Sequence, residues 1–347
     1  MKALNLYHMN DLRYEECEMP VLESDNEVII EVKATGICGS DTSRYSKLGP
    51  YIKGMTFGHE FSGVIFQVGQ GVSGLAVEDR VTACPTIVCG KCYYCKQGAY
   101  SRCKNLYVIG SYVPGSFAQY VKVPASHVLK IPDNVDFQTA AMVEPSAVVA
   151  HGFYKTHLKP GMTVAVIGTG SIGLLAIQWA KIFGATQIIA IDIDDNKLEV
   201  AKKVGADTVI NSAKVDLEEM IQQNFADKID LAVESSGAKA VIGPILTLPK
   251  KGGEVLFLGI PYADIDLSRT QFEKILRNEL SLHGSWNALS AVFPGKEWTS
   301  TLYYMSKGAI RVDSIVSHYV PLSKGPEMFN RIIQRKENIN KVIFYPE

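Results

Sequence analysis

The sequence lacks an excess of charge of either sign. Its 347 residues contain 35 Lys and Arg against 36 Asp and Glu, which gives a formal net charge of −1. Nucleic-acid-binding proteins usually carry a basic excess, so we expect no nucleic-acid partner. Apolar residues make up 47% of the chain, which excludes a disordered chain and is enough for the core of a globular protein with two domains.

Long hydrophobic runs are also scarce. The longest uncharged stretch includes Thr163–Ala180, but its three spaced glycines are typical of a strand, a turn and a helix rather than of a membrane span. Met1–Asn5 turns polar too soon for a signal peptide. We therefore expect a cytoplasmic protein without a membrane partner.

Cysteine is present in an odd number, seven, which argues against a disulfide framework. Four of them crowd into fifteen residues: Cys89, Cys92, Cys95 and Cys103. Four thiolates at this spacing predict one closed, tetrahedral and therefore structural zinc site, in a lobe over residues 84–106. An iron–sulfur cluster is the weaker alternative, because three of the four have ferredoxin-like spacing.

The pattern of apolar residues changes along the chain. Residues 1–145 contain short β-branched runs, such as those at 27–33, 63–68 and 116–123. Between 146 and 284, strands alternate with helices, which predicts a doubly wound parallel sheet of the Rossmann type. Residues 285–347 contain a helix and a last strand, and we expect them to return to the first domain. The fold class is therefore α/β, with a second, β-rich domain.

A glycine motif follows the strand predicted at 163–167. Gly168 allows a tight turn, Gly170 lets the backbone approach a pyrophosphate, and Gly173 lets the helix pack on the strand. Asp192 ends the next strand, where a carboxylate binds the adenine ribose and repels a 2′-phosphate, so NAD is favoured over NADP. The predicted cofactor-binding residues are Gly168, Gly170, Ser171, Ile172, Gly173, Asp192 and Lys197.

A second group of metal-ligating residues is spread over the first domain. Cys38, His59 and Glu144 offer a thiolate, an imidazole and a carboxylate. Three such ligands leave a fourth position of zinc open for water or substrate. Each residue alone is more simply explained as part of the core or of a helix terminus, but together with the dinucleotide motif they predict a catalytic zinc.

These motifs resemble those of the zinc-dependent medium-chain dehydrogenase/reductase family. The family's zinc signature, G-H-E-x2-G-x5-G-x2-V, is matched from Gly58 to Val72. The resemblance implies a GroES-like catalytic domain beside the Rossmann domain, Cys38, His59 and Glu144 as catalytic-zinc ligands, and a dimer or tetramer. It also implies that Ser40 relays the proton, that Asp41 orients His59 and that Glu60 approaches the metal during turnover.

The substrate follows less directly. Glu144 in place of a cysteine is similar to the polyol dehydrogenase branch, and segments 272–280, 284–286 and 294–298 resemble galactitol-1-phosphate 5-dehydrogenases. That resemblance implies oxidation of galactitol 1-phosphate to tagatose 6-phosphate, with Arg44 and Lys47 as candidate phosphate ligands, although both are equally well explained as solvated surface charges. The alternatives are sorbitol, 2,3-butanediol or threonine as substrate, and a non-catalytic NAD-binding scaffold.

Overall fold

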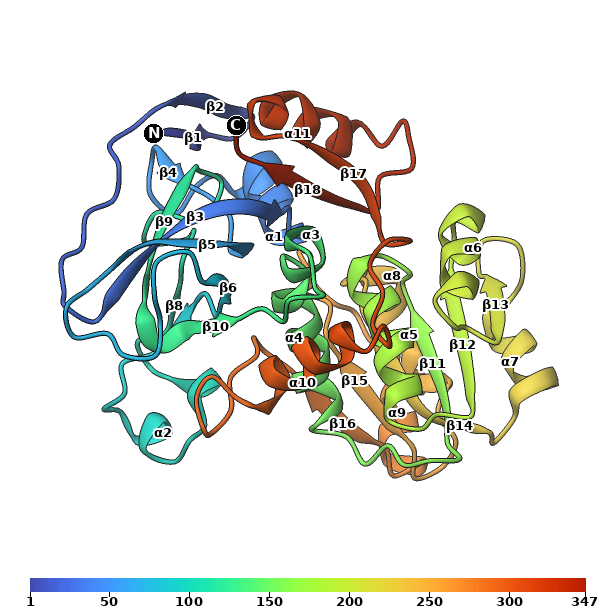
Figure 1. Cartoon of the computed structure of the whole chain (residues 1–347). Helices are drawn as coiled ribbons and strands as arrows, with labels where there is room; N and C mark the ends of the chain where they lie inside the picture. Colours follow the sequence, from blue (N-terminus) through green and yellow to red (C-terminus); the bar gives the residue numbers. More distant parts are fainter. The chain divides into compact units, whose positions relative to one another are not determined.

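The structure, a computed structural model, describes all 347 residues and divides them into two compact units. Unit 1 comprises Met1–Pro145, Ala288–Lys307 and Val316–Glu347, and unit 2 comprises Ser146–Asn287 and Gly308–Ile315. The first part of the chain, in blue and cyan, and the last, in red, thus build unit 1 together (Figure 1). None of the helices combines the length and the apolar character that crossing a bilayer requires.

Unit 1 is built on a seven-stranded sheet with the order β10-β6-β5-β3-β18-β17, to which β9 adds by pairing with β3. A three-stranded sheet, β2-β1-β4, and the pair β7-β8 accompany it. The strands are β1 (Lys2–His8), β2 (Asp11–Glu16), β3 (Glu27–Gly36), β4 (Met55–Thr56), β5 (Glu60–Val68), β6 (Arg80–Ala83), β7 (Thr86–Ile87), β8 (Tyr107–Val108), β9 (Tyr120–Pro124), β10 (Val128–Lys130), β17 (Val316–Pro321) and β18 (Lys341–Tyr345).

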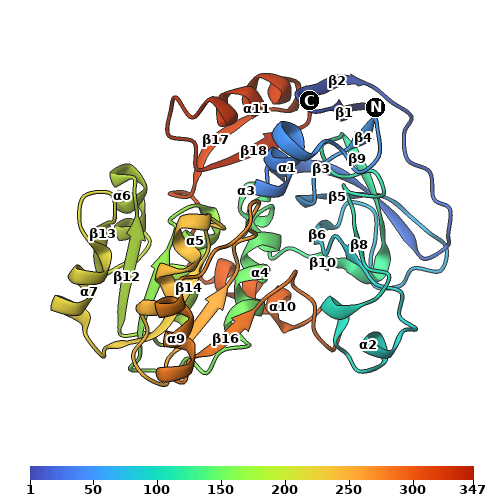
Figure 2. The same cartoon turned by 180° about the vertical axis from the view of Figure 1, so that it is seen from behind.

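The helices of unit 1 are short. They are α1 (Gly39–Ser43), a π-helical turn (Arg44–Leu48), α2 (Tyr93–Lys96), α3 (Phe137–Ala140), α10 (Lys296–Ser306) and α11 (Gly325–Gln334). Helix α4 (Val143–Phe153) begins in unit 1 and continues into unit 2. Strand β18 lies beside β3 and runs antiparallel to it, with Phe344 opposite Thr35, so the start of β18 lies next to the segment that follows β3 (Figure 2).

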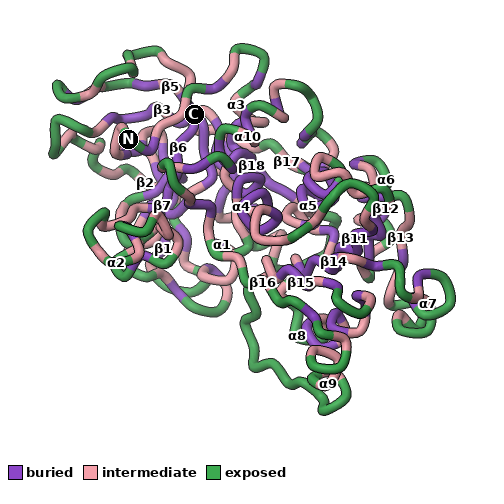
Figure 3. Tube along the Cα trace, turned by 90° about the horizontal axis from the view of Figure 1, so that it is seen from below, coloured by how far each residue is buried: buried purple, intermediate pink, exposed green.

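Unit 2 is one six-stranded parallel sheet with the order β13-β12-β11-β14-β15-β16. Its elements are β11 (Thr163–Ile167), α5 (Ser171–Ile182), β12 (Gln187–Asp192), α6 (Asp195–Lys203), β13 (Thr208–Asn211), α7 (Leu217–Phe225), β14 (Ile229–Glu234), α8 (Lys239–Ile242), β15 (Glu254–Phe257), α9 (Arg269–Arg277) and β16 (Ser281–Gly284). The strand order reverses between β11 and β14, which is where doubly wound sheets bind their ligands. Strand β11 is buried throughout and β12 is buried except at its two ends, in purple in Figure 3.

Most of the predicted elements agree with the structure, and two differ. The strand predicted from Ser116 begins only at Tyr120. Before it, the amide of Phe117 donates to the carbonyl of Phe57, and the carbonyl of Phe117 accepts from the amide of Leu4. Residues 308–315 lie with unit 2 rather than unit 1, because the backbone of Arg311 is held by both ends of the Gln178 amide, at 2.8 and 3.0 Å.

Candidate active site

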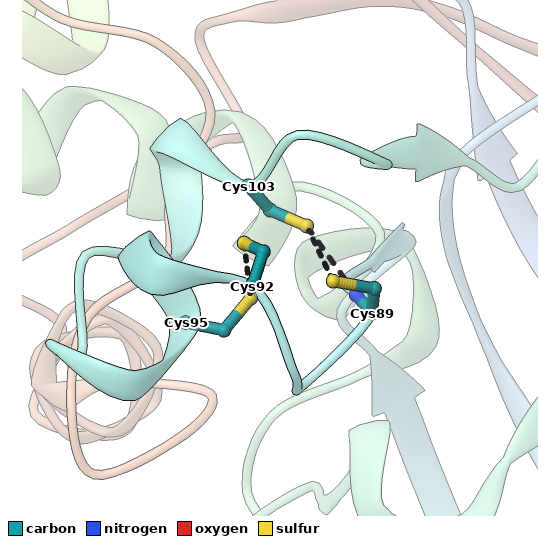
Figure 4. Close-up of side chains that lie close together, drawn as sticks. All are labelled: Cys89, Cys92, Cys95 and Cys103. Atoms are coloured by element: carbon teal, nitrogen blue, oxygen red, sulfur yellow. Dashed lines mark hydrogen bonds between the residues drawn. The ribbon is translucent and has the colours of Figure 1, made fainter.

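The four clustered cysteines converge in the lobe around α2. Figure 4 shows their sulfur atoms pointing toward one another. The Sγ atoms of Cys92 and Cys95 are 3.6 Å apart, those of Cys89 and Cys103 are 3.5 Å apart, and all four ligand atoms lie within 4.8 Å of one another. A tetrahedral zinc ion with bonds of about 2.3 Å requires similar spacing, whereas a disulfide requires about 2.05 Å. All seven cysteines of the chain are free.

Backbone amides favour the thiolate at two of the four cysteines of this lobe, whereas burial raises the pKa of Cys95 to about 12. The amides of Lys104 and Cys95 lower the pKa of Cys92 to about 6, and those of Lys91 and Cys92 lower the pKa of Cys89. A lowered pKa favours the thiolate, which is the form that binds zinc. The four sulfurs complete a tetrahedron and leave no position for a substrate, so the geometry fits a structural zinc.

The second candidate metal group is assembled where β3 ends and β5 begins. Cys38 is the N-cap of α1, and its backbone amide donates to Oδ2 of Asp41 at 2.9 Å. Oδ1 of the buried Asp41 lies 3.7 Å from Nδ1 of His59. A carboxylate behind a metal-ligating histidine fixes the orientation of the ring. The first turn of α1 therefore places both a thiol and the carboxylate that orients His59.

The loop before β5 is shaped by Gly58, whose φ is +95° and where a Cβ would overlap Phe117. This turn presents His59 and Glu60 toward Cys38, and the ligand atoms of these three residues lie within 4.8 Å of one another. The carboxylate in this group is thus Glu60, and Glu144 is not part of it. The assignment of Glu144 as a zinc ligand stays a prediction.

Glu60 is held by a lysine that the sequence analysis missed. The buried ammonium of Lys341 in β18 forms an ion pair with Oε2 of Glu60 and donates to the carbonyl of Ile37 at 2.9 Å. The pairing of β18 with β3 brings it there, and a Cβ at Gly36 would overlap Oε2 of Glu60. The only sequence signal was a lysine opening an otherwise apolar strand.

Glu144 lies in the first turn of α4. Burial of its carboxyl and the nearby charge of Glu60 raise its pKa to about 7, against the opposing influence of His59 and Lys341. Burial also raises the pKa of Asp41, with His59 opposing the rise. Glu144 is therefore close enough to the group around His59 to be affected by its charges.

The charges in and around this group fit a divalent cation. Cys38, Asp41, Glu60 and Glu144 supply acidic groups, and Lys341 supplies one buried positive charge against them. Several ionised carboxylates in a low-dielectric interior are stable only when nearby positive charge compensates their negative charge. The mixture of thiol, imidazole and carboxylate is a donor set of zinc, with fewer ligands than a closed structural site has.

The dinucleotide motif of unit 2 has the expected geometry. Gly168 has a φ of +88°, Gly170 is the N-cap of α5, and a Cβ at Gly173 would overlap the carbonyl of Gly168. Ser171 and Ile172 form the first turn of α5. The amides of a helix N-terminus that follows such a turn are suited to a pyrophosphate.

Asp192 ends β12 and is tied to the glycine turn. Its Oδ2 accepts from the amide of Thr169 at 2.6 Å and from its hydroxyl at 2.9 Å, while Oδ1 accepts from the amides of Ile193 and Asp194. Lys197 lies one turn into α6 and is half-buried. The structure thus joins the carboxylate predicted to bind ribose to the turn predicted to bind pyrophosphate.

Comparisons with known proteins identify the family of the chain. Residues 24–133 match the family model of the alcohol dehydrogenase GroES-like domain, and residues 171–299 match that of the zinc-binding dehydrogenases. The sorbitol dehydrogenase of Bacillus subtilis is 33% identical over 352 residues, which cover 100% of this chain and 97% of that protein. The chain belongs to the zinc-dependent medium-chain dehydrogenase family.

Two further relatives of this dehydrogenase come from Escherichia coli. Its galactitol 1-phosphate 5-dehydrogenase is 33% identical over 310 residues, covering 88% of this chain and 89% of that protein. The crystal structure of galactitol-1-phosphate dehydrogenase superposes with a TM-score of 0.94 at 30% identity over 100% of both chains. The protein is a zinc-dependent alcohol or polyol dehydrogenase, with zinc and a nicotinamide dinucleotide as cofactors, rather than a non-catalytic scaffold.

Proposed function

We propose that this dehydrogenase oxidises a secondary hydroxyl of a polyol phosphate, converting galactitol 1-phosphate to tagatose 6-phosphate with NAD as acceptor. The observation that carries the proposal is the placement of Arg44 and Lys47 in the π-helical turn that continues α1, the helix capped by Cys38. The phosphate dianion of such a substrate requires a compensating cation within hydrogen-bond reach of its oxygens. The likeness to galactitol 1-phosphate 5-dehydrogenase supports the same choice.

Two contacts position the guanidinium of Arg44. Its guanidinium carbon lies 3.6 Å from the centre of the Tyr51 ring, and Nη1 donates to the carbonyl of Gly49 at 3.4 Å. Tyr51 in turn stacks on Tyr112, with the ring centres 4.8 Å apart. Stacking holds the plane of the guanidinium and leaves other N–H groups for a phosphate. Lys47 is exposed and would add a mobile second charge.

The metal-ligating residues define the reacting end of the substrate. Cys38 and His59 would hold the catalytic zinc, with Glu60 or Glu144 as the third ligand. When bound, zinc lowers the pKa of the substrate hydroxyl, and the nicotinamide accepts the hydride. Metal content distinguishes the two carboxylates: the ligand is the one whose change to glutamine, Glu60→Gln or Glu144→Gln, removes the catalytic zinc while the zinc of the cysteine lobe remains.

Ser40 and Asp41 follow Cys38 in the first turn of α1. We infer that Ser40 accepts the proton of the bound hydroxyl and passes it to solvent. Asp41 acts through His59, whose ring it faces. Ser40→Ala should therefore lower kcat without lowering zinc content.

The test of the substrate is a kinetic comparison of galactitol 1-phosphate with galactitol, sorbitol, 2,3-butanediol and threonine. We expect the phosphorylated substrate to have the highest kcat/KM, and Arg44→Ala to raise its KM roughly 10- to 100-fold, as expected for a charged hydrogen bond. Arg44→Ala should leave KM for free galactitol unchanged. Arg13→Ala is the matched control. Arg13 also stacks on a tyrosine, Tyr7, but it belongs to β2 and not to the turn that continues α1.

An unphosphorylated polyol is the second candidate substrate, favoured by the likeness to sorbitol dehydrogenase over the whole chain. A kcat/KM for sorbitol above that for galactitol 1-phosphate, together with an Arg44→Ala enzyme that behaves like the parent, would establish this candidate.

We also propose that the enzyme forms a homodimer or homotetramer through the edge strand β16. This strand ends the sheet of unit 2, and Ser281 and Leu282 in it are exposed. An unpaired edge can pair with a second copy. Light scattering on the purified enzyme gives the number of subunits.

A further inference from the structure

A third group of metal-ligating side chains lies in unit 2. His157 follows α4, Glu254 opens β15, and His283 lies in β16. Glu254 is at the amino end of its parallel strand, whereas the glycine turn follows the carboxyl end of β11. The group therefore lies at the edge of the sheet opposite to the dinucleotide motif and is not part of it.

The carboxylate of Glu254 joins the two histidines. Its Oε2 lies 2.6 Å from Nε2 of His283, and its Oε1 lies 3.1 Å from Nδ1 of His157. The backbone amide of His157 donates to both oxygens at 3.2 Å. One ligand atom from each residue fits within 4.8 Å of the others, and the two ring centres are 6.1 Å apart.

These distances are close to those of a metal site. Bonds of about 2.0–2.1 Å to nitrogen and oxygen set the ligand atoms of a tetrahedral zinc about 3.3 Å apart. Reaching that spacing lengthens the contact between Glu254 and His283 by about 0.7 Å and the contact between Glu254 and His157 by about 0.2 Å. The side chain of His157 is 74% exposed and is free to move, whereas the contact between Glu254 and His283, which are 14% and 17% exposed, opens only by rotation of these two side chains.

Two imidazoles and one carboxylate also select the class of ion. Magnesium and calcium prefer oxygen ligands, whereas imidazole suits zinc, copper, nickel and cobalt. We propose that His157, Glu254 and His283 form a third metal site of this protein, which binds a divalent transition metal of the zinc class with an open fourth position. The bound ion would fasten the segment after α4 to the edge strand β16.

The site is tested on the holoenzyme that already holds zinc in its other two sites. Cobalt(II) is added, and metal content per chain and the absorption spectrum are measured. We expect one additional equivalent of cobalt whose spectrum lacks the thiolate-to-cobalt absorption, because no cysteine belongs to the site. Cobalt that replaced zinc at Cys38 or in the cysteine lobe would show that absorption.

Two variants connect the extra equivalent to these residues. His157→Gln should weaken cobalt binding at least tenfold and cannot unfold the core, because His157 is exposed. Glu254→Gln keeps the shape of the side chain and should weaken binding by a similar factor. His8→Gln, at an exposed histidine of β1, should leave binding unchanged.

The proposal fails if the holoenzyme takes up no extra cobalt, or if His157→Gln and Glu254→Gln, both with the melting temperature of the parent, bind it as tightly as the parent does. Either result would leave the three side chains as a hydrogen-bonded triad. The outcome does not depend on the substrate of the dehydrogenase.

Discussion

The candidate sites of the two units are built from different kinds of groups, side chains in unit 1 and backbone amides in unit 2. In unit 1, side chains of opposite charge are buried together, as in the ion pair of Lys341 and Glu60, which are 3% and 2% exposed. In unit 2, the site is a backbone turn of glycines, and its one acidic side chain, Asp192, is itself held by backbone amides. The two sites should therefore respond in opposite ways to the loss of a side chain and to the gain of one.

The difference follows from what each ligand requires. A metal ion needs donor atoms of defined charge, which only side chains such as Cys38 and His59 supply. A pyrophosphate needs close approach to amide N–H groups, which any side chain at Gly170 would obstruct. The metal group of unit 1 should thus lose function when a side chain is truncated, and the glycine turn of unit 2 when a side chain is added.

Truncation at the metal group should have the largest effect. Cys38→Ala removes a zinc ligand, and we expect kcat/KM to fall about 10³-fold or more, because the metal supplies several kcal/mol of transition-state stabilisation. The assay measures NADH formation alongside zinc content. Cys17→Ala, which removes a cysteine outside both clusters, should leave activity and zinc unchanged. Full activity in Cys38→Ala would remove Cys38 from the active site.

Loss of the buried cation should have the next largest effect, on stability. Lys341→Met leaves the carboxylate of Glu60 buried without its partner, which should cost about 3–5 kcal/mol in urea unfolding. The double variant Lys341→Met/Glu60→Gln should recover most of that loss. Lys214→Met breaks an exposed pair with Asp195 in unit 2 and should leave stability unchanged. If the double variant is no more stable than Lys341→Met, the ion pair is not the cause.

The cysteine lobe should respond to truncation in stability rather than in chemistry. Cys92→Ala should release one zinc per chain and lower the melting temperature by roughly 5 °C or more, because structural zinc contributes to folding. The zinc at Cys38 should remain, and the residual kcat per folded molecule should match the parent. A variant that melts like the parent would argue against a structural metal in the lobe.

Added volume in the glycine turn should produce smaller, separable effects. Gly173→Ala places a methyl against the carbonyl of Gly168, so we expect about 1–3 kcal/mol of destabilisation together with weaker NAD binding. A Cβ at Gly170 meets nothing within 4 Å, so Gly170→Ala should melt like the parent and lose only NAD affinity. Calorimetry of both variants, with and without NAD, separates the two roles. Equal melting temperatures for the two would contradict this distinction.

The contrast between the units also explains what the sequence could predict. The elements and the turn of unit 2 were predictable because each depends on neighbours along the chain: apolar runs that alternate between strands and helices, and glycines two and three residues apart. Lys341 was not, because Glu60 lies 281 residues away and only the pairing of β18 with β3 brings them together. For the same reason the sequence alone does not show that His157 and His283 meet, although Glu254 joins them in space.

The smallest effect should come from the one acidic side chain of the dinucleotide motif. Asp192→Asn removes the charge that repels a 2′-phosphate but keeps an oxygen for the amide of Thr169. We expect the ratio of kcat/KM for NAD to that for NADP to fall about tenfold, which corresponds to 1.4 kcal/mol. Asp194→Asn is the matched control, because Asp194 caps α6 and asparagine caps equally well. An unchanged ratio in Asp192→Asn would mean that the carboxylate serves only the turn, since its four hydrogen bonds already engage both of its oxygens.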